Sequence, residues 1–158
     1  MHGCTPVITR PRGYPYEGAF ASRNPYACLA GAYAVGNTDI VMGRFGWVAN
    51  GQVSNVQSPN APLGLILPRF GLWSLSYFQD GAFYLRAGKN VTLATSGDFW
   101  VRFPYGAFIG APVYADPATG IAYTADGGGF ERTAWTVITN APAGGLAIIS
   151  PYAFIGGS

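Results

Sequence analysis

Residues 87–103 read AGKNVTLATSGDFWVRF and predict two short β-strands joined by a tight turn at Ser96-Gly97. Both predicted strands, Val91–Thr95 and Asp98–Phe103, are rich in β-branched or aromatic residues, which favour strands. In the second strand, apolar and mixed positions alternate, as expected when one face is buried: Phe99, Val101 and Phe103 on one side, Asp98, Trp100 and Arg102 on the other. The face that carries Trp100 should therefore be polar or shared with a neighbour.

The same pattern of short alternating segments and turn signals continues outward from this stretch. The alternation over Asp39–Ala49 predicts a strand with Val41, Phe45 and Trp47 on one face, and Asn50-Gly51 after it is typical of a type I′ hairpin. Asp116–Gly120 fits a type I turn followed by a glycine bulge. Further strands are expected at these ranges: Leu72–Phe78, Ala82–Ala87, Val113–Ala115, Ile121–Thr124, Thr133–Thr139 and Gly145–Ser150. Strands that recur every 8–12 residues or so indicate an all-β sandwich or barrel.

The composition supports a single β-domain. A chain of 158 residues is the size of one domain, and only 10% of its residues are charged where about 25% is usual. Lys89 is the one lysine, and Glu17 and Glu131 are the two glutamates, so the charged residues that favour helices are nearly absent.

Residues 1–30 differ from the rest of the chain because four prolines recur through them, at positions 6, 11, 15 and 25. This spacing forbids a continuous helix or a central strand and favours an extended, polyproline-like backbone. We predict an extended N-terminal arm over residues 1–30 and a single β-domain over residues 31–158. The aromatic residues of the arm favour docking against another surface.

The residue types needed for catalysis or metal binding are scarce. His2 is the only histidine and lies at the chain terminus, which argues against a catalytic triad and a His/Cys metal site. Asp116 and Asp126 lie in turns, where a carboxylate usually caps its own backbone. Cys4 and Cys28 have no metal-binding spacing and are expected to be reduced thiols, with a disulfide as the less favoured alternative.

The charge distribution argues against nucleic acid as a partner. The net charge is +2, and the eight arginines are spread along the chain without forming a basic stripe. No apolar run reaches the length that spans a bilayer; the longest candidates, 105–115 and 144–157, are interrupted by glycine and proline. The N-terminus also lacks the apolar segment of a secretory signal, so synthesis in a cytosol is expected.

Aromatic residues are in surplus, with ten Tyr, ten Phe and four Trp. Trp47, Trp73 and Trp135 are expected in the core. A monomer with so few charges would expose large apolar patches, and a single lysine cannot guard its sheet edges against pairing. The chain is therefore interpreted as an assembly protein. Exposed aromatic rings also suit sugar stacking, which leaves a carbohydrate- or receptor-binding module as the alternative, and a small hydrolase as a third.

Five stretches resemble phage structural cement proteins, the capsid decoration proteins of tailed bacteriophages. They keep their order and spacing within residues 17–150: Gly18–Pro25, Gly43–Val48, Ala87–Arg102, Ile109–Gly120 and Thr133–Val137. The resemblance implies a jelly-roll-like domain, made in the host cytoplasm and bound to the outer surface of the virion head, with no enzymatic activity and no cofactor. It also implies a homodimer or homotrimer that bridges neighbouring major capsid protein subunits.

Candidate contact residues follow from the arm and from the mixed face of the 98–103 strand. We predict that contacts to the capsid or to another copy involve Arg10, Arg12, Tyr14, Tyr16, Phe20, Arg23, Trp100 and Arg102. In this hypothesis the arm reaches over a neighbouring subunit.

Overall fold

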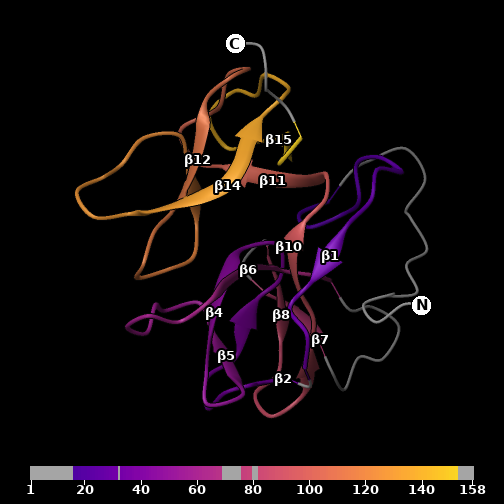
Figure 1. Cartoon of the computed structure of the whole chain (residues 1–158), viewed down its shortest axis with the longest axis vertical. Coiled ribbons are helices and arrows are strands. Elements are labelled where there is room, and N and C mark those ends of the chain that lie inside the picture. The colour runs from indigo at the N-terminus through magenta and orange to yellow at the C-terminus, as the bar shows by residue number, and fades with distance from the viewer. Residues whose placement is uncertain (1–15, 32, 69–75, 80–81, 153–158) are drawn as a thin grey trace.

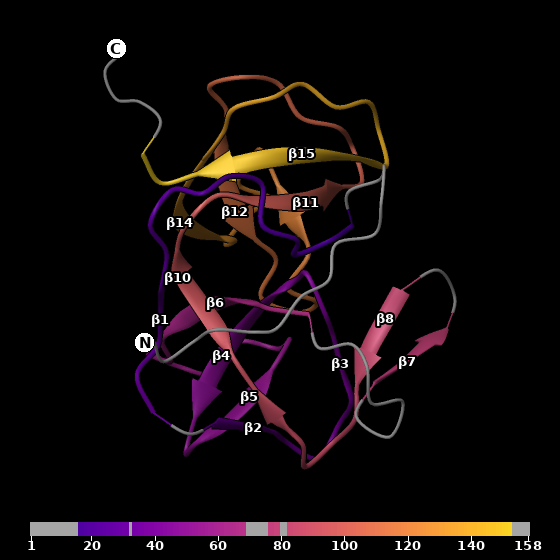
Figure 2. The same ribbon diagram turned by 90° about the vertical axis from the view of Figure 1, so that its right-hand side faces the viewer.

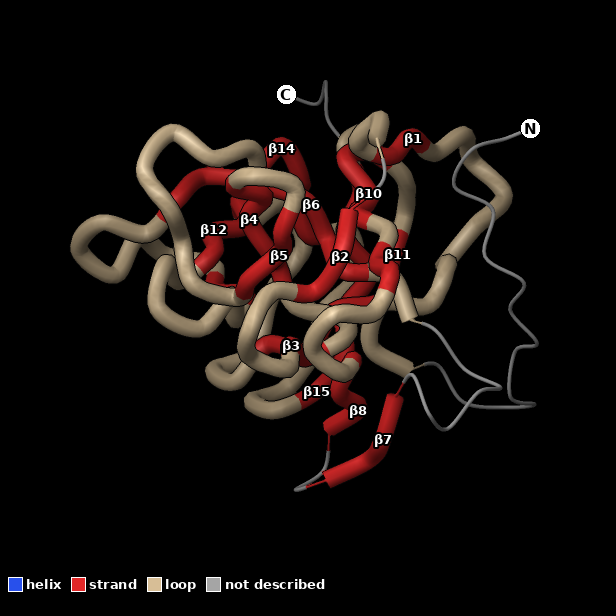
Figure 3. Tube along the Cα trace, turned by 90° about the horizontal axis from the view of Figure 1, so that it is seen from below, coloured by secondary structure: helices blue, strands red, loops and turns tan. Residues whose placement is uncertain are grey.

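The computed structural model describes residues 16–31, 33–68, 76–79 and 82–152, and in these residues it contains strands and no helix. Figure 3 shows strands and loops throughout the described part of the chain. The predicted all-β fold is thus confirmed. The strands form three sheets that pack face to face as a sandwich, and they do not close into a barrel. No helix among the described residues is long and apolar enough to cross a membrane.

The first sheet has five antiparallel strands and lies at the C-terminal end of the molecule (Figure 1). Its order is β11 (Phe99–Phe103), β15 (Gly145–Ser150), β14 (Glu131–Val137), β12 (Pro112–Ala115) and β13 (Ala122–Tyr123). The predicted strands over 98–103 and 145–150 are neighbours in this sheet, paired from Phe99↔Ile149 to Phe103↔Gly145.

The second sheet has seven strands, and the third has three. The order of the second is β1 (Ala27–Cys28), β10 (Leu93–Ser96), β6 (Leu63–Ile66), β4 (Phe45–Ala49), β5 (Gln52–Ser54), β2 (Tyr33–Val35) and β9 (Asn90–Val91), with β2 and β5 parallel. The order of the third is β3 (Ile40–Val41), β8 (Ala82–Leu85) and β7 (Ser76–Gln79).

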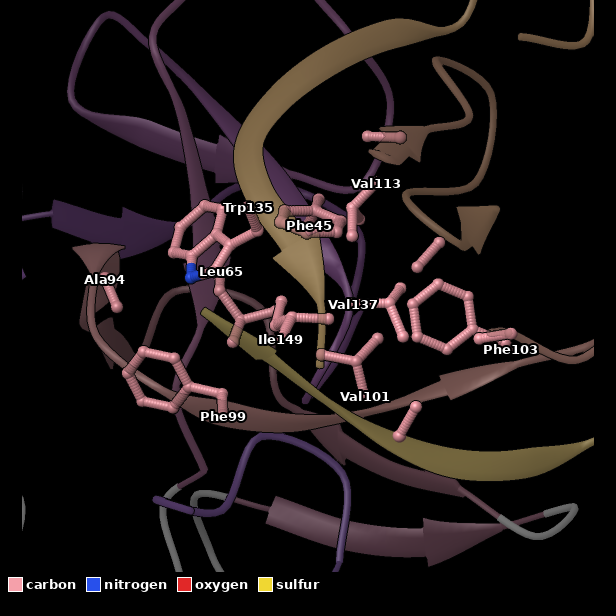
Figure 4. Packing of buried hydrophobic residues seen from close by; sticks show 14 of the residues in the cluster. Phe45, Leu65, Ala94, Phe99, Val101, Phe103, Val113, Trp135, Val137 and Ile149 are labelled. Carbon is pink, nitrogen blue, oxygen red and sulfur yellow. The ribbon is translucent and has the colours of Figure 1, made fainter. Parts of the chain in front are cut away.

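The seven-stranded sheet is the middle layer because both of its faces are buried. Phe45 and Trp47 of β4 belong to the core shared with the five-stranded sheet, where Phe45 packs 5.7 Å from Trp135 between ring centroids (Figure 4). Val48 of the same strand belongs to a second core, which includes Leu85 of the three-stranded sheet. Alternation along β4 therefore supplies both cores.

The turn predictions at the two best-marked hairpins are confirmed. Asn50 and Gly51 both have positive φ, 53° and 75°, as a type I′ turn between β4 and β5 requires. Gly120 has φ 75° and donates its N–H to Asp116 O at 2.7 Å, which closes the turn between β12 and β13. The predicted strand over 72–78 lies mostly outside the described residues; β7 begins at Ser76.

The prediction of one continuous strand over Asp39–Ala49 is wrong. The chain forms β3 and β4 in two different sheets and turns between them at Gly43, which has φ 80°. A Cβ atom placed on Gly43 would lie 2.5 Å from Glu17 Cβ and 2.8 Å from Glu17 C. Only glycine lets the backbone of residue 17 pass this close.

Residues 16–30 lie against the β-domain (Figure 2). Phe20 forms an antiparallel bridge with Phe99 of β11, and β1 pairs with β10. The division into an arm over 1–30 and a domain over 31–158 stays a prediction, since residues 1–15 lie outside the described part. The expectation of reduced thiols is wrong for Cys28, which is disulfide-bonded. That expectation rested on the cellular compartment alone, which says nothing about geometry; Cys4 lies outside the described residues.

Candidate interface surfaces

The outer face of the five-stranded sheet is the first candidate surface. Alternate residues of its strands, such as Val101, Val137 and Ile149, are buried in the core, so the intervening side chains point away from the core. Six of the half-buried or exposed side chains on this side are called the outer sheet face: Trp100, Arg102, Tyr114, Arg132, Leu146 and Ile148. The strand register places Trp100 opposite Ile148, and Arg102 opposite Leu146.

The two arginines of this face are held in place. Arg132 donates from Nη1 to the carbonyls of Thr133 and Trp135, at 2.8 and 3.0 Å, and its guanidinium lies 5.8 Å from the ring centroid of Tyr114. Arg102 donates from Nε to Glu17 Oε2 at 2.7 Å and from Nη1 to Gly144 O, while 47% of its side chain stays exposed. Ordered guanidinium groups beside aromatic and aliphatic side chains are typical of protein interfaces.

The loop between β11 and β12 is the second candidate surface. Three of the most exposed large apolar side chains in the described residues lie in this 104–111 loop: Tyr105 at 84%, Phe108 at 63% and Ile109 at 61%. The backbone beneath them is well bonded. Ala107 and Ala141 exchange two hydrogen bonds of 3.0 and 2.9 Å, and Ile109 N donates to Asn140 Oδ1 at 2.9 Å. The loop therefore presents its apolar side chains without a large entropic cost on binding.

An apolar pocket adjoins this loop. The cavity of about 340 Å³ is lined by Tyr105, Gly106, Ala122, Tyr123, Thr124, Ala125, Gly127 and Phe130, and none of these residues is charged. Three of its rings pack against one another in a row: the centroids of Tyr105 and Tyr123 lie 5.6 Å apart, and those of Tyr123 and Phe130 lie 5.2 Å apart. We call this cavity the aromatic pocket. Burial raises the pKa of Tyr123, and the nearby Asp116 raises it further, so the phenol is neutral at pH 7.

The turn over residues 126–130, which the Asp126 carboxylate caps, forms one wall of the aromatic pocket. Asp126 Oδ1 accepts the backbone N–H groups of Gly128, Gly129 and Phe130 at 2.8–3.0 Å. The hydrogen bonds from Gly129, Phe130 and Gly128 hold the pKa of this carboxyl below its usual value. The expected capping role of Asp126 is thus confirmed. Gly127 has no side chain, and a Cβ there would lie 2.6 Å from Phe130 Cζ, so the ring rests directly on the turn.

Comparison with known protein families identifies the chain. The family model described as structural cement protein (E217 gp24/Pam3 gp6) matches residues 8–151. The chain belongs to the phage structural cement protein family. The resemblance stated from the sequence is therefore confirmed, and membership makes this a structural phage protein associated with capsid proteins. No curated protein sequence matches this cement protein.

A solved structure shares the fold of the cement protein. A chain in "The capsid of Myoviridae Phage XM1" superposes with a TM-score of 0.64 at 16% sequence identity, and the match covers 98% of the cement protein and 100% of that chain. At this identity the likeness concerns the arrangement of strands and not individual contact residues.

The predicted contact residues of the cement protein lie at different places in the structure. Trp100 and Arg102 lie together on the outer sheet face. Phe20 instead packs within its own domain, with its ring centroid 5.0 Å from that of Phe99, and Tyr16 is half-buried. Arg23 is exposed. The remaining predicted residues, Arg10, Arg12 and Tyr14, lie outside the described residues.

A buried carboxylate fixes the position of Arg23. Asp98 is 4% exposed, and its Oδ2 accepts Ser22 Oγ at 2.7 Å and Asn24 Nδ2 at 2.6 Å. These two donors flank Arg23 and hold its bend against the start of β11. Asp98 is thus a structural residue of the cement protein. Within the described residues, no group of three His, Cys, Asp or Glu side chains is placed to hold a metal ion.

Sequence reasoning missed the 104–111 loop and the aromatic pocket. It considers residues 105–115 as a membrane span, for which the segment is too short, and residues 109–120 as part of the family resemblance, but it predicts no exposed apolar loop there. The usable signal is the uncharged run PYGAFIG at 104–110, in which two glycines bracket large apolar residues. A glycine-bounded apolar run between two strands indicates a loop that exposes those side chains.

Proposed function

We propose that this cement protein binds the outer surface of the phage head as a homodimer or homotrimer and bridges neighbouring major capsid protein subunits, without enzymatic activity. The observation that carries the proposal is the outer sheet face. It combines Arg132 and Arg102, which is paired with Glu17, with the apolar or aromatic side chains of Trp100, Tyr114, Leu146 and Ile148. Such a face suits a partner surface that places a carboxylate near Arg132 and apolar side chains near Trp100.

Two observations support a binding role for Trp100. It occupies a half-buried position directly opposite Ile148, so the two side chains form an apolar centre beside Arg102. Tryptophan and arginine are also the residue types that most often dominate the free energy of protein–protein association. The outer sheet face thus has an apolar centre and carries two ordered arginines.

Stabilisation of the head would follow from mass action. A protein that binds the mature shell and not its disrupted form stabilises the shell by RT ln(1 + [L]/Kd) at each site, which is about 2.7 kcal/mol at a concentration of 100 Kd. Repeated over many sites, this contribution opposes rupture by packaged DNA.

The test measures decoration of undecorated heads by charge-reversed variants. Arg132→Glu lies on the outer sheet face, whereas Lys89→Glu makes the same change of charge at an exposed turn residue between β8 and β9. We expect Arg132→Glu to weaken head binding at least about tenfold and Lys89→Glu to leave it nearly unchanged. Thermal unfolding of both variants checks the fold. Equal binding by the two variants would contradict the assignment of this face.

The N-terminal arm is a second proposed contact with the head. Residues 1–15 carry Arg10, Arg12 and Tyr14 and contain no carboxylate, so their charge has the same sign as that of the outer sheet face. Deletion of residues 1–15 should lower head occupancy at a fixed protein concentration. Full decoration by the truncated protein would refute this role of the arm.

A further inference from the structure

We propose that the 104–111 loop and the aromatic pocket form the surface through which two copies of this chain associate, with Phe108 of each copy entering the pocket of the other. Self-association is part of the proposed function, on which this proposal rests, and the structure assigns it a location. The head-binding face and the self-association surface are then different parts of the molecule.

The chemistry of the loop favours association. Phe108 and Ile109 are 63% and 61% exposed, and residues 104–111 contain no charged side chain. Soluble proteins seldom leave neighbouring large apolar side chains in water unless a partner covers them. The bonds between Ala107 and Ala141, and from Gly110 N to Val137 O at 2.8 Å, fix the loop before any partner arrives.

The pocket offers a matching cavity on the same side of the molecule. Tyr105 and Gly106 line it and also belong to the 104–111 loop, so Phe108 projects from the backbone segment that forms one wall of the pocket. A surface with a protruding apolar side chain next to an apolar cavity is complementary to a second copy of itself. Two-fold association then uses both features twice.

Shape favours a second copy as the occupant. The residues of the 104–111 loop and of the aromatic pocket lining carry no charge, and the Asp126 carboxylate in the adjoining turn accepts three backbone N–H groups. An uncharged protrusion beside an uncharged cavity needs no charged partner. A second copy supplies both features, so it can cover the loop and fill the pocket in one two-fold contact.

The test uses two variants that each block self-association from one side. Phe108→Lys would bring an ammonium group into the apolar pocket, and Ala125→Glu places a carboxylate at the exposed rim of the pocket. Each variant alone should be monomeric where the wild type is oligomeric in sedimentation velocity, with self-association at least about tenfold weaker. An equimolar mixture of the two should associate again, because the introduced ammonium group then meets the introduced carboxylate in one contact and the wild-type pair forms the other.

Val56→Lys is the matched control. Val56 is 55% exposed and lies in the loop after β5, outside the proposed surface, so this variant should sediment like the wild type. A monomeric wild type, unaltered association of Phe108→Lys, or a mixture that stays monomeric would each overturn the proposal.

Head decoration, measured separately, distinguishes the two proposals. If wild-type protein fails to decorate heads, the proposed function fails, whereas restored association in the mixture would still locate the self-contact. If Phe108→Lys associates normally and loses head binding, the loop faces the capsid, and the location proposed here is wrong while the proposed function stands.

Discussion

Replacing Gly43 by alanine should destabilise the protein far more than the same change at Gly88. The two glycines have nearly equal backbone angles, φ 80° and 81°, so alanine pays the same left-handed penalty of about 1–2 kcal/mol at each. Their surroundings differ. A Cβ on Gly43 would lie 2.8 Å from the backbone carbon of Glu17, whereas a Cβ on Gly88 has nothing within 4 Å.

The contact at Gly43 adds an overpacking cost of about 1–3 kcal/mol, because a backbone atom cannot move aside as a flexible side chain can. We expect Gly43→Ala to lower the free energy of unfolding by about 2 kcal/mol more than Gly88→Ala. For a chain of this size the difference corresponds to about 4–8 °C in Tm. Urea unfolding and calorimetry of both variants measure it. Equal losses would show that residue 17 is not packed against Gly43.

Three further predictions concern single side chains. Trp135→Phe removes the indole N–H that donates to Gly97 O at 2.8 Å in a buried site, and should lower the free energy of unfolding by about 2–4 kcal/mol in urea titrations; a loss under about 1 kcal/mol would contradict the role of this bond. The pKa of the Asp126 carboxyl should lie below its usual value in an NMR pH series. Its contribution to stability is therefore present above the pKa of the unfolded chain and is lost as the pH falls through the lower pKa of the folded protein. A normal or raised pKa would disprove the turn geometry. Asp98→Ala should speed amide hydrogen exchange around Arg23, because the bend loses its two side-chain bonds to the carboxylate; unchanged exchange would mean that other contacts hold the bend.

Local sequence signals predicted much of the fold because they depend on neighbours in the chain. Asn50-Gly51 required a type I′ turn whatever lay around it, and the alternation of β11 placed Phe99 in the core and Trp100 outside it. The turn at Gly43, where the chain passes from β3 in one sheet to β4 in another, had no such local signal in the sequence. It depends on the close approach of Glu17, which is distant in sequence and lies within the segment expected to be an arm.

The candidate surfaces show the same division between local and long-range information. Trp100 and Arg102 were predicted because both positions follow from alternation within one strand. The aromatic pocket combines Tyr105 with Tyr123 and Phe130, which the fold brings together from separate loops and strands. The spacing of these residues along the chain does not reveal that they are neighbours in space until the order of the strands in the sheet is known.

The middle sheet has a mechanical consequence for the whole molecule. Since β4 sends Trp47 into one core and Val48 into the other, a pull that opens either layer must also loosen the strand on which the opposite layer rests. The protein should therefore unfold under force in a single cooperative step, without an intermediate in which one layer has detached. A protein built this way transmits a pulling force from one outer sheet to the other through β4, and its three sheets unfold together.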